Sequence, residues 1–422
     1  MHNPLTTHDQ CSPRKQRAEL TFKHNVANGR HGWLRLTPAY SVKVVEDILN
    51  RKQGCLNVVD PFSGTGTTAL CAAMRGHNAT GIDINPFLVW FGNAKVRRYS
   101  KKQLAEFRNS IAKLLAGLRD SKTPVASPPP IFNILRWWEQ KNLTLLCRLK
   151  GAIDHSFPED EPVRDLLLIA FCRTMISLSN AAFNHQSMSF KSTDVENKQI
   201  MLFSSGDQAE LEKKFSDDVA FVAAGAADNP DASASVLFAD AREVPRVFAE
   251  GTDLFITSPP YPNRMSYIRE LRPFMYWLGF LKEAPEAGEL DWRAIGGTWG
   301  VATSRVAAWE KNPDTYFPAY LDKLLEGIRS ASAKSGGVLS NYVGRYFEDI
   351  WSHLRSAVKV MKPGAEMHYI VGNSKFYDVL VPVETIYRDM LEHLGVAQTE
   401  IIPLRKRNSK KELVEYDVIA AV

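Results

Sequence analysis

The stretch NVVDPFSGTGTTAL, from Asn57 to Leu70, decides the fold class of this chain. A short apolar run ends at Asp60 and enters a turn with two glycines, and a segment rich in helix-forming residues follows. Gly76 marks the expected end of that helix, and a second apolar strand then runs to Asp83. A strand, a tight turn, a helix and another strand are typical of a parallel α/β sheet. We therefore expect an α/β fold built around such a sheet.

The composition is that of an ordinary soluble protein. The chain has 422 residues, of which 45% are hydrophobic and 23% charged, and no apolar run approaches the roughly 20 residues of a membrane span. The five cysteines are scattered without a C-x-x-C pair, and the histidines show no metal-ligand spacing. Neither a disulfide framework nor a metal site is indicated, so we expect a cytoplasmic protein.

Three regions follow one another along the chain. Residues 1–95 contain an N-terminal segment and the strand–turn–helix–strand unit. Residues 96–234 show repeated helical periodicity, and we interpret them as a largely helical insertion. The α/β pattern returns in residues 235–422, with a further insertion at about 262–340 and C-terminal strands joined by a basic loop.

Basic side chains gather at two places beside the expected α/β elements, although the net charge is only +5. A solvated surface is the simplest interpretation of either cluster alone. Taken together, they favour a polyanionic partner. The first cluster is Lys95, Arg97, Arg98, Lys101 and Lys102, and the second is Arg405, Lys406, Arg407, Lys410 and Lys411.

The first turn has the properties of a nucleotide site. Gly64 and Gly66 let the backbone turn sharply and approach a ligand, and the helix that follows offers free N–H groups. Asp83 ends the next strand, where a carboxylate can accept hydrogen bonds from a ribose diol. The glycines, together with Ala69, also match the loose dinucleotide fingerprint, so a nicotinamide-dependent oxidoreductase is one alternative.

Two residues of the first turn indicate a different cofactor. A carboxylate at Asp60 would repel a pyrophosphate but suits a cationic ligand. Pro61 and Phe62 form an apolar wall rather than a phosphate cradle. Together they indicate a nucleoside with a positively charged amino acid moiety and no phosphate, and S-adenosylmethionine is such a molecule.

The second turn is TSPPY, Thr257 to Tyr261, directly after the apolar run DLFI. Two prolines fix the backbone and remove two N–H donors, so the nearby carbonyls are rigid, free acceptors. With the Ser258 hydroxyl and the Tyr261 ring, they suit a planar base with an exocyclic amine. The amine would donate to Ser258 Oγ and the Pro259 carbonyl, which leaves its lone pair free to attack a sulfonium methyl. Such an amine is out of reach inside a duplex, so the base must be flipped out.

The two motifs together resemble those of the amino-group DNA methyltransferases, which methylate N4 of cytosine or N6 of adenine with S-adenosylmethionine. DPFSGTGTT is similar to the cofactor loop of that family, and TSPPY to its catalytic tetrapeptide, with the serine more typical of N4-cytosine enzymes. The resemblance implies a Rossmann-like methyltransferase fold with a mixed, mostly parallel sheet. It assigns the cofactor-binding half to residues 1–95, a candidate target-recognition region to 96–234 and the catalytic half to 235–422.

Site residues follow from this resemblance position by position. Asp83 would bind the ribose hydroxyls, and Asp240 would lie near the adenine. Ser258, Pro259, Pro260 and Tyr261 would hold the target base. The full set of expected cofactor residues is Thr37, Pro38, Asp60, Phe62, Ser63, Gly64, Gly66, Thr67, Asp83, Ile84, Asp240 and Ala241.

The resemblance implies double-stranded DNA as the partner, and it leaves open a cognate restriction endonuclease or other defence proteins. The cofactor half precedes the catalytic half here, whereas many relatives have the reverse order. Two segments are candidates for reading the DNA: Ser179 to Ser192, and the block after the catalytic motif.

Several alternatives stay open beside N4-cytosine methylation. N6-adenine methylation uses the same chemistry. An RNA guanosine-N2 methyltransferase would share the cofactor loop, but such enzymes usually carry Asp where this chain has Ser258. A catalytically silent DNA-binding module is disfavoured by the intact Ser-Pro-Pro-Tyr. The chain contains no Pro-Cys dipeptide, so a C5-cytosine mechanism lacks its nucleophile.

Overall fold

A seven-stranded sheet forms the centre of the computed structural model, in the strand order β10-β11-β7-β6-β1-β2-β5. The strands β5, β2, β1, β6 and β7 run parallel, and β11 is antiparallel to both β7 and β10. The expected mixed, mostly parallel sheet is thereby confirmed. The strands are β1 Asn57–Asp60, β2 Asn78–Asp83, β5 Ala234–Phe238, β6 Thr252–Thr257, β7 Met361–Gly372, β10 Gln398–Lys406 and β11 Val414–Ala421. The structure describes residues 17–36, 40–182, 189–190, 208–246, 248, 251–298, 301–407 and 412–422.

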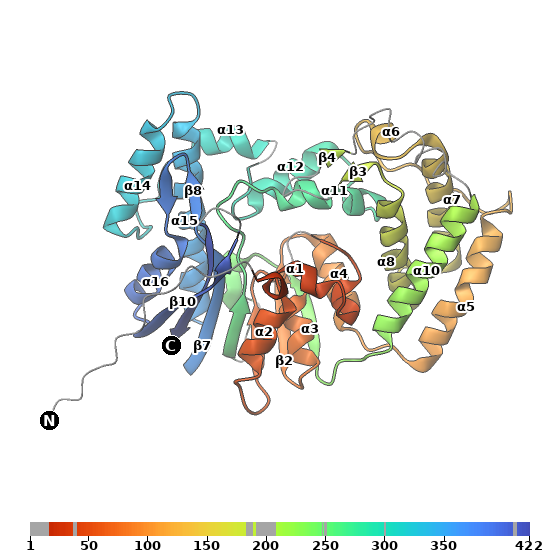
Figure 1. The fold of residues 1–422 in the computed structure, drawn as a ribbon, viewed down its shortest axis with the longest axis horizontal. Helices are drawn as coiled ribbons and strands as arrows, with labels where there is room; N and C mark the ends of the chain where they lie inside the picture. The colour runs from red at the N-terminus through yellow and green to blue at the C-terminus, as the bar shows by residue number, and fades with distance from the viewer. Residues whose placement is uncertain are drawn as a thin grey trace.

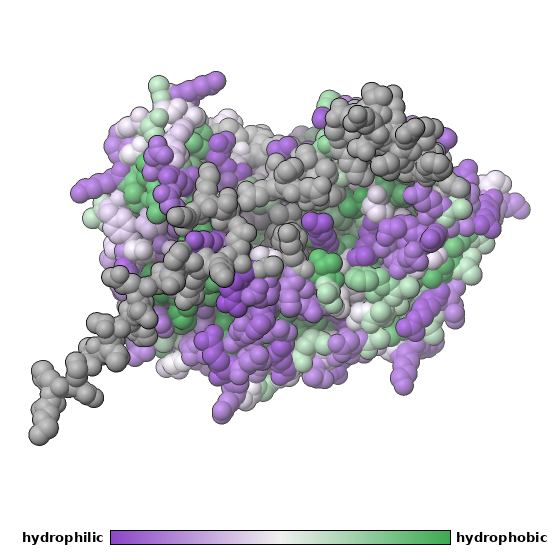
Figure 2. Space-filling view, viewed as in Figure 1, coloured by the Kyte–Doolittle hydropathy of each residue, from purple (hydrophilic) through white to green (hydrophobic). Residues whose placement is uncertain are grey.

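Helices cover both faces of this sheet (Figure 1). Successive strand residues point to opposite faces, so Val58 packs in one hydrophobic core and Val59 in another. The core of Val58 is closed by α2 and α3, and that of Val59 by α15 and α16. These helices are α2 Val42–Leu49, α3 Thr67–Ala73, α15 Gly336–Val358 and α16 Val383–His393. The outer surface over α2 is mainly hydrophilic (Figure 2).

A block of helices between β2 and β5 forms a lobe of its own (Figure 1). These helices share one hydrophobic core with α4 and α11, which connect the lobe to the sheet. The buried Arg30 ties the lobe down, since its guanidinium donates to the carbonyls of Gly225 (3.1 Å) and Lys95 (2.7 Å). The helices of the lobe and its connections are α4 Pro86–Val96, α5 Lys101–Gly117, α7 Gln140–Ser156, α8 Pro162–Ser177, α10 Gln208–Ala226 and α11 Tyr267–Trp277.

The remaining elements are short or lie around the sheet and the lobe. Among the described residues, no helix combines the length and the apolar character that crossing a membrane requires. The helices are η1 Ala18–Leu20, α1 Phe22–Asn25, η2 Gly29–Gly32, α6 Ile134–Trp137, η4 Ala241–Arg246, α12 Ala284–Arg293, α13 Val301–Ala307 and α14 Ala319–Ser330, and the hairpin strands are β3 Ala181–Ala182, β4 Ser189–Phe190, β8 Ser374–Phe376 and β9 Val379–Val381.

The strand order brings the two sequence motifs together. From β1 the chain moves outward to β2 and β5 on one side, and it then returns to β6 on the other side of β1. The turns that follow β1 and β6 therefore leave the same edge of the sheet as neighbours, at the position where ligands bind in open α/β sheets. Thr257 at the end of β6 donates a hydrogen bond of 2.6 Å to Asp60 at the end of β1.

Only part of the first basic cluster is exposed: Arg98, Lys101 and Lys102 lie at the surface, whereas Lys95 is buried and Arg97 is half-buried. Lys95 is fully buried, and its ammonium donates to the Thr65 carbonyl at 2.7 Å. Arg97 forms an ion pair of 2.9 Å with Asp165, and Arg98 donates to backbone carbonyls. Lys95, Arg97 and Arg98 therefore stabilise the fold, because each joins the end of α4 or the residues just after it to another part of the chain.

Candidate active site

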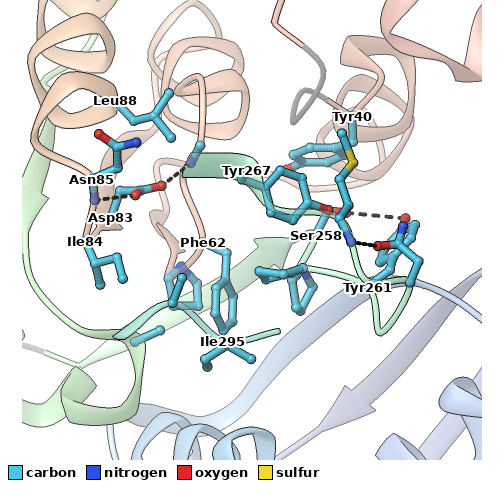
Figure 3. Close-up of a pocket in the computed structure, with 18 of the residues that line it drawn as sticks. Tyr40, Phe62, Asp83, Ile84, Asn85, Leu88, Ser258, Tyr261, Tyr267 and Ile295 are labelled. Atoms are coloured by element: carbon cyan, nitrogen blue, oxygen red, sulfur yellow. Dashed lines mark hydrogen bonds between the residues drawn. The ribbon is translucent and has the colours of Figure 1, made fainter. Parts of the chain in front are cut away.

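A cavity of about 610 Å³ lies at the carboxyl ends of β1, β2 and β6. Residues of both motifs line it (Figure 3). Asp83, Ile84 and Asn85 lie at one end, Ser258 and Tyr261 at the other, and the Phe62 ring between them. The cavity is therefore continuous from the predicted ribose site to the predicted base site.

Asp83 is held firmly at the end of β2. Its carboxylate accepts backbone hydrogen bonds from Gly64 (2.9 Å) and Asn85 (2.8 Å). Burial raises the pKa of Asp83 to about 7, even though both hydrogen bonds act in the opposite direction. The side chain lines the cavity, so its remaining lone pairs are available to a ligand with hydroxyl donors.

Phe62 forms a rigid apolar wall of the cavity. Its ring packs edge-on against His353, with 4.8 Å between the centroids. His353 is fixed by the Ala241 carbonyl at 2.8 Å and the Tyr369 hydroxyl at 3.0 Å. Burial lowers the pKa of His353 to about 4, so the imidazole is neutral at pH 7 and behaves as a packing group. Ile84 and Ile295 add apolar surface nearby.

Asp240 and Ala241 line the same cavity at the end of β5. Both carboxylate oxygens of Asp240 accept from Arg242, at 2.9 and 2.7 Å, and Arg242 also pairs with Asp349 at 2.7 Å. Burial raises the pKa of Asp240, but the hydrogen bonds and charge of Arg242 outweigh this effect and leave it below its ordinary value. Asp240 is therefore ionised and fixed in orientation.

Asp60 lies behind the cavity wall, not on it. Its side chain is 1% exposed, and the oxygen that accepts from Thr257 also accepts from the Phe62 backbone at 3.1 Å. Burial raises the pKa of Asp60 to about 6, although the hydrogen bond from Thr257 opposes the shift. Asp60 thus connects the turn after β1 to the turn after β6, a role that its sequence motif did not indicate.

Other predicted cofactor residues also lie outside the lining. Ser63 packs against Gly81, where an added Cβ would approach its hydroxyl to 2.3 Å. The hydroxyl of the buried Thr67 meets that of Thr65 at 3.1 Å. Gly66 has φ +70°, and its Cβ position faces the Gly92 backbone. These residues shape the loop, whereas Gly64 lines the cavity. Thr37 and Pro38 lie outside the described residues.

Replacing Gly66 by alanine is expected to lower the free energy of unfolding by more than the about 1–2 kcal/mol that positive φ alone costs. The added Cβ would lie 3.2 Å from Gly92 Cα, which is backbone and yields little. Gly54→Ala is the matched control, because Gly54 has φ +76° with nothing within 4 Å. Urea unfolding of both variants checks the prediction, and equal losses would show that the close approach to α4 has no energetic cost.

The four residues of the second motif all line the cavity. Ser258 donates its hydroxyl proton to the Ile370 carbonyl at 3.0 Å, so its oxygen keeps lone pairs for an outside donor. The Tyr261 hydroxyl donates to Glu415 at 2.9 Å. Burial, followed by the nearby Glu415 carboxylate, raises the pKa of Tyr261, and the phenol therefore stays protonated. The arrangement offers a hydroxyl acceptor beside a fixed aromatic ring.

The hairpin of β10 and β11 supplies a wall that motif reading did not find. Arg405 pairs with Glu415 through two contacts of 2.8 and 3.0 Å, and Arg407 lies over the Tyr261 ring. The second basic cluster was visible in sequence, but its contact with the turn after β6 was not. Lining residues outside the predicted set are Arg17, Leu20, Thr21, Tyr40, Pro61, Ile82, Asn85, Leu88, Ala239, Asn263, Met265, Tyr267, Ile268, Arg293, Ala294, Ile295, Arg405, Lys406, Arg407 and Glu415.

Comparison with known proteins gives distant, nearly full-length similarities. No protein-family model matches the chain. It is similar to the type II methyltransferase M.BsoBI of Geobacillus stearothermophilus, with 21% identity over 95% of this chain and 86% of that protein. It is also similar to the type II methyltransferase M.MvaI of Kocuria varians, with 20% identity over 90% of this chain and 82% of that protein. Among solved structures, the rRNA methyltransferase aviRa of Streptomyces viridochromogenes is similar at 12% identity, covering 95% of this chain and 96% of that one with a TM-score of 0.30, too low to support an inference.

The fold and the relatives define the class of the protein. A mostly parallel sheet with a cavity at its switch point, together with relatives that span nearly the whole chain, indicates an enzyme of the methyltransferase class. Within that class, the named relatives are type II methyltransferases.

Proposed function

We propose that this protein is a DNA methyltransferase that transfers a methyl group from S-adenosylmethionine to the exocyclic N4 amine of cytosine. The observation that carries the proposal is the single cavity that joins Asp83 to Ser258 and Tyr261 (Figure 3). One continuous space with a ribose-type carboxylate at one end and an amine-type acceptor at the other suits transfer between two bound molecules.

The residues at the Asp83 end fit the cofactor. The Asp83 carboxylate suits the two hydroxyls of a ribose, and the apolar surface of Phe62 and Ile84 suits an adenine ring. Asp60 lies behind this wall, where its ionised form would favour a cationic ligand even without contact. When bound, S-adenosylmethionine supplies a methyl group carried by a positively charged sulfur.

The residues at the Ser258 end fit a flipped base. Ser258 Oγ donates its proton elsewhere, so it would accept a hydrogen bond from the exocyclic amine. The Pro259 carbonyl is the second acceptor of the motif, and Tyr261 supplies a flat face for stacking. Two acceptors that draw the amine hydrogens to one side leave the nitrogen lone pair free to attack the methyl group.

The relatives and Ser258 support one of the candidate substrates over the others. The relatives are type II methyltransferases, which supports DNA as the substrate and speaks against an oxidoreductase. Serine before Pro-Pro-Tyr favours N4 of cytosine over N6 of adenine, and it disfavours guanosine-N2 of RNA. N6 of adenine is the second candidate, because the acceptors of the pocket suit either amine.

The direct test incubates the purified protein with plasmid DNA and methyl-labelled S-adenosylmethionine. The DNA is then digested, and the nucleosides are separated and identified by mass. We expect the label in N4-methylcytosine. Label in N6-methyladenine would replace the proposed base with the second candidate, and an absence of label in DNA would overturn the proposal as a whole.

The helical lobe is our candidate for target recognition. It occupies residues 96–234, which separate the cofactor half from the catalytic half. The segment Ser179 to Ser192 lies largely outside the described residues, and the second candidate segment begins at Met265 and includes α11. We further propose that the enzyme acts alongside a restriction endonuclease or other defence protein, as expected of a type II methyltransferase.

A further inference from the structure

One face of the Tyr261 ring is already occupied in the structure. The Arg407 guanidinium carbon lies 4.7 Å from the ring centroid. Both residues line the cavity, so the covered face belongs to the proposed base site. Ring centroids of stacked aromatic pairs are about 4.5–7 Å apart, and a guanidinium at this distance therefore takes the place that a base would need.

The Tyr261 ring cannot turn away easily to offer another surface. Its hydroxyl is held by Glu415, and Glu415 is 5% exposed and clamped by Arg405. If a base is to stack on this face, Arg407 must move, because Tyr261 is fixed.

Arg407 is held more loosely than its neighbour Arg405. Arg405 forms two charge-assisted contacts with Glu415, whereas Arg407 donates to the neutral Asn373 carbonyl at 2.7 Å. Within the part of the chain that the structure describes, no carboxylate forms an ion pair with Arg407. A charge whose contacts with the described residues are a carbonyl and a ring face can be exchanged for a phosphate at little cost.

The position of Arg407 over the ring depends on Gly372, which has no side chain. A Cβ added at Gly372 would lie 2.7 Å from Arg407 Nη1 and 2.9 Å from its Cδ. Glycine at the end of β7 therefore leaves the space in which the guanidinium lies. This contact offers a way to displace Arg407 without removing its charge.

We propose that Arg407 is a placeholder for the target base. In the DNA-free enzyme it covers the stacking face of Tyr261, and on base entry it leaves the ring and binds a phosphate of the flanking DNA. The inference rests on the proposed function, because it assumes a flipped base at Tyr261. It adds a residue that couples entry of the base to binding of the nucleic-acid backbone.

Two substrates with and without phosphate test the placeholder. The first is plasmid DNA, and the second is the free deoxynucleoside of whichever base the wild-type enzyme methylates in DNA. In Arg407→Ala, we expect kcat/KM for the nucleoside to rise about three- to tenfold, because the ring face is open. We expect KM for DNA to rise instead, and the slope of log KM against log salt to become shallower by about one.

Gly372→Ala separates the two roles of Arg407. This variant keeps the charge but displaces the guanidinium, so the nucleoside should again react faster while the salt slope for DNA stays at the wild-type value. Arg51→Ala is the control, since Arg51 is exposed and precedes β1, at the end of the sheet opposite the cavity. It should change neither substrate.

The outcomes distinguish the inference from the proposed function. If wild-type enzyme labels DNA but Arg407→Ala slows both substrates, Arg407 is a structural residue and the inference is wrong. A shallower salt slope with an unchanged nucleoside rate would leave a phosphate contact only and would also overturn the placeholder. If the wild-type enzyme labels no DNA, the proposed function itself fails.

Discussion

Replacement of Ser258 by alanine is expected to lower kcat for DNA methylation by about 100- to 1,000-fold, the usual effect of removing one preorganised hydrogen-bond group. The Ser258 proton is donated to Ile370, so the hydroxyl serves the substrate as an acceptor, and alanine has no substitute for it. The cofactor end of the cavity is formed by other residues, so the affinity for S-adenosylmethionine should stay within about twofold of wild type.

The measurement separates binding from chemistry. Cofactor affinity is determined by calorimetry, and methyl transfer is followed under single-turnover conditions with labelled cofactor. Ser352→Ala is the matched control, because Ser352 is an exposed serine on α15 whose hydroxyl donates to a backbone carbonyl in the same helix. A Ser258→Ala enzyme with near wild-type turnover would show that the hydroxyl has no part in activating the amine.

The sequence predicted the sheet and both turns because each signal is local. The strand, the glycine turn and the helix are each encoded by consecutive residues, and Ser-Pro-Pro-Tyr is also a run of consecutive residues. The direction of the Asp60 side chain could not be predicted from the neighbouring residues. A carboxylate at a strand end can point into the cavity or toward the neighbouring strand. Here it points to Thr257, whose position beside it depends on the pairing of β1 with β6.

The two basic clusters also show that sequence alone does not tell where a side chain lies in the fold. Their composition is alike, yet Lys95 of the first is buried under the turn after β1 and Arg407 of the second lies over the Tyr261 ring. Charge runs in sequence report composition, whereas the burial of each cation depends on which distant segment packs against it. The Arg405–Glu415 pair became recognisable only once the antiparallel β10–β11 hairpin placed the two residues opposite each other.

The affinity for S-adenosylmethionine is expected to rise about tenfold between pH 6 and pH 8, and Asp83 is the cause. Burial raises its pKa to about 7, so in the free enzyme the carboxyl is mostly protonated at pH 6 and mostly ionised at pH 8. The ionised form accepts hydrogen bonds from ribose hydroxyls more strongly than the protonated form. Because Asp83 must be ionised to bind the ribose well, the affinity falls as the pH drops below the pKa of Asp83. Above that pKa, the affinity changes little with pH.

Asp83→Asn should lower the affinity at pH 8 by about 100-fold, since it removes charge assistance from two hydrogen bonds worth about 1.5–3 kcal/mol each. It should also flatten the pH dependence, and any slope that persists would report Asp60, whose pKa is raised by burial to about 6. Asp47→Asn is the control, because Asp47 is half exposed on α2 and pairs with Lys43 at the surface. Calorimetric titrations at four pH values, with folding checked by thermal melting at each, decide the matter. If wild-type affinity is flat from pH 6 to pH 8 while Asp83→Asn still binds tightly, the cofactor does not use Asp83, and the assignment of this end of the cavity to the ribose is wrong.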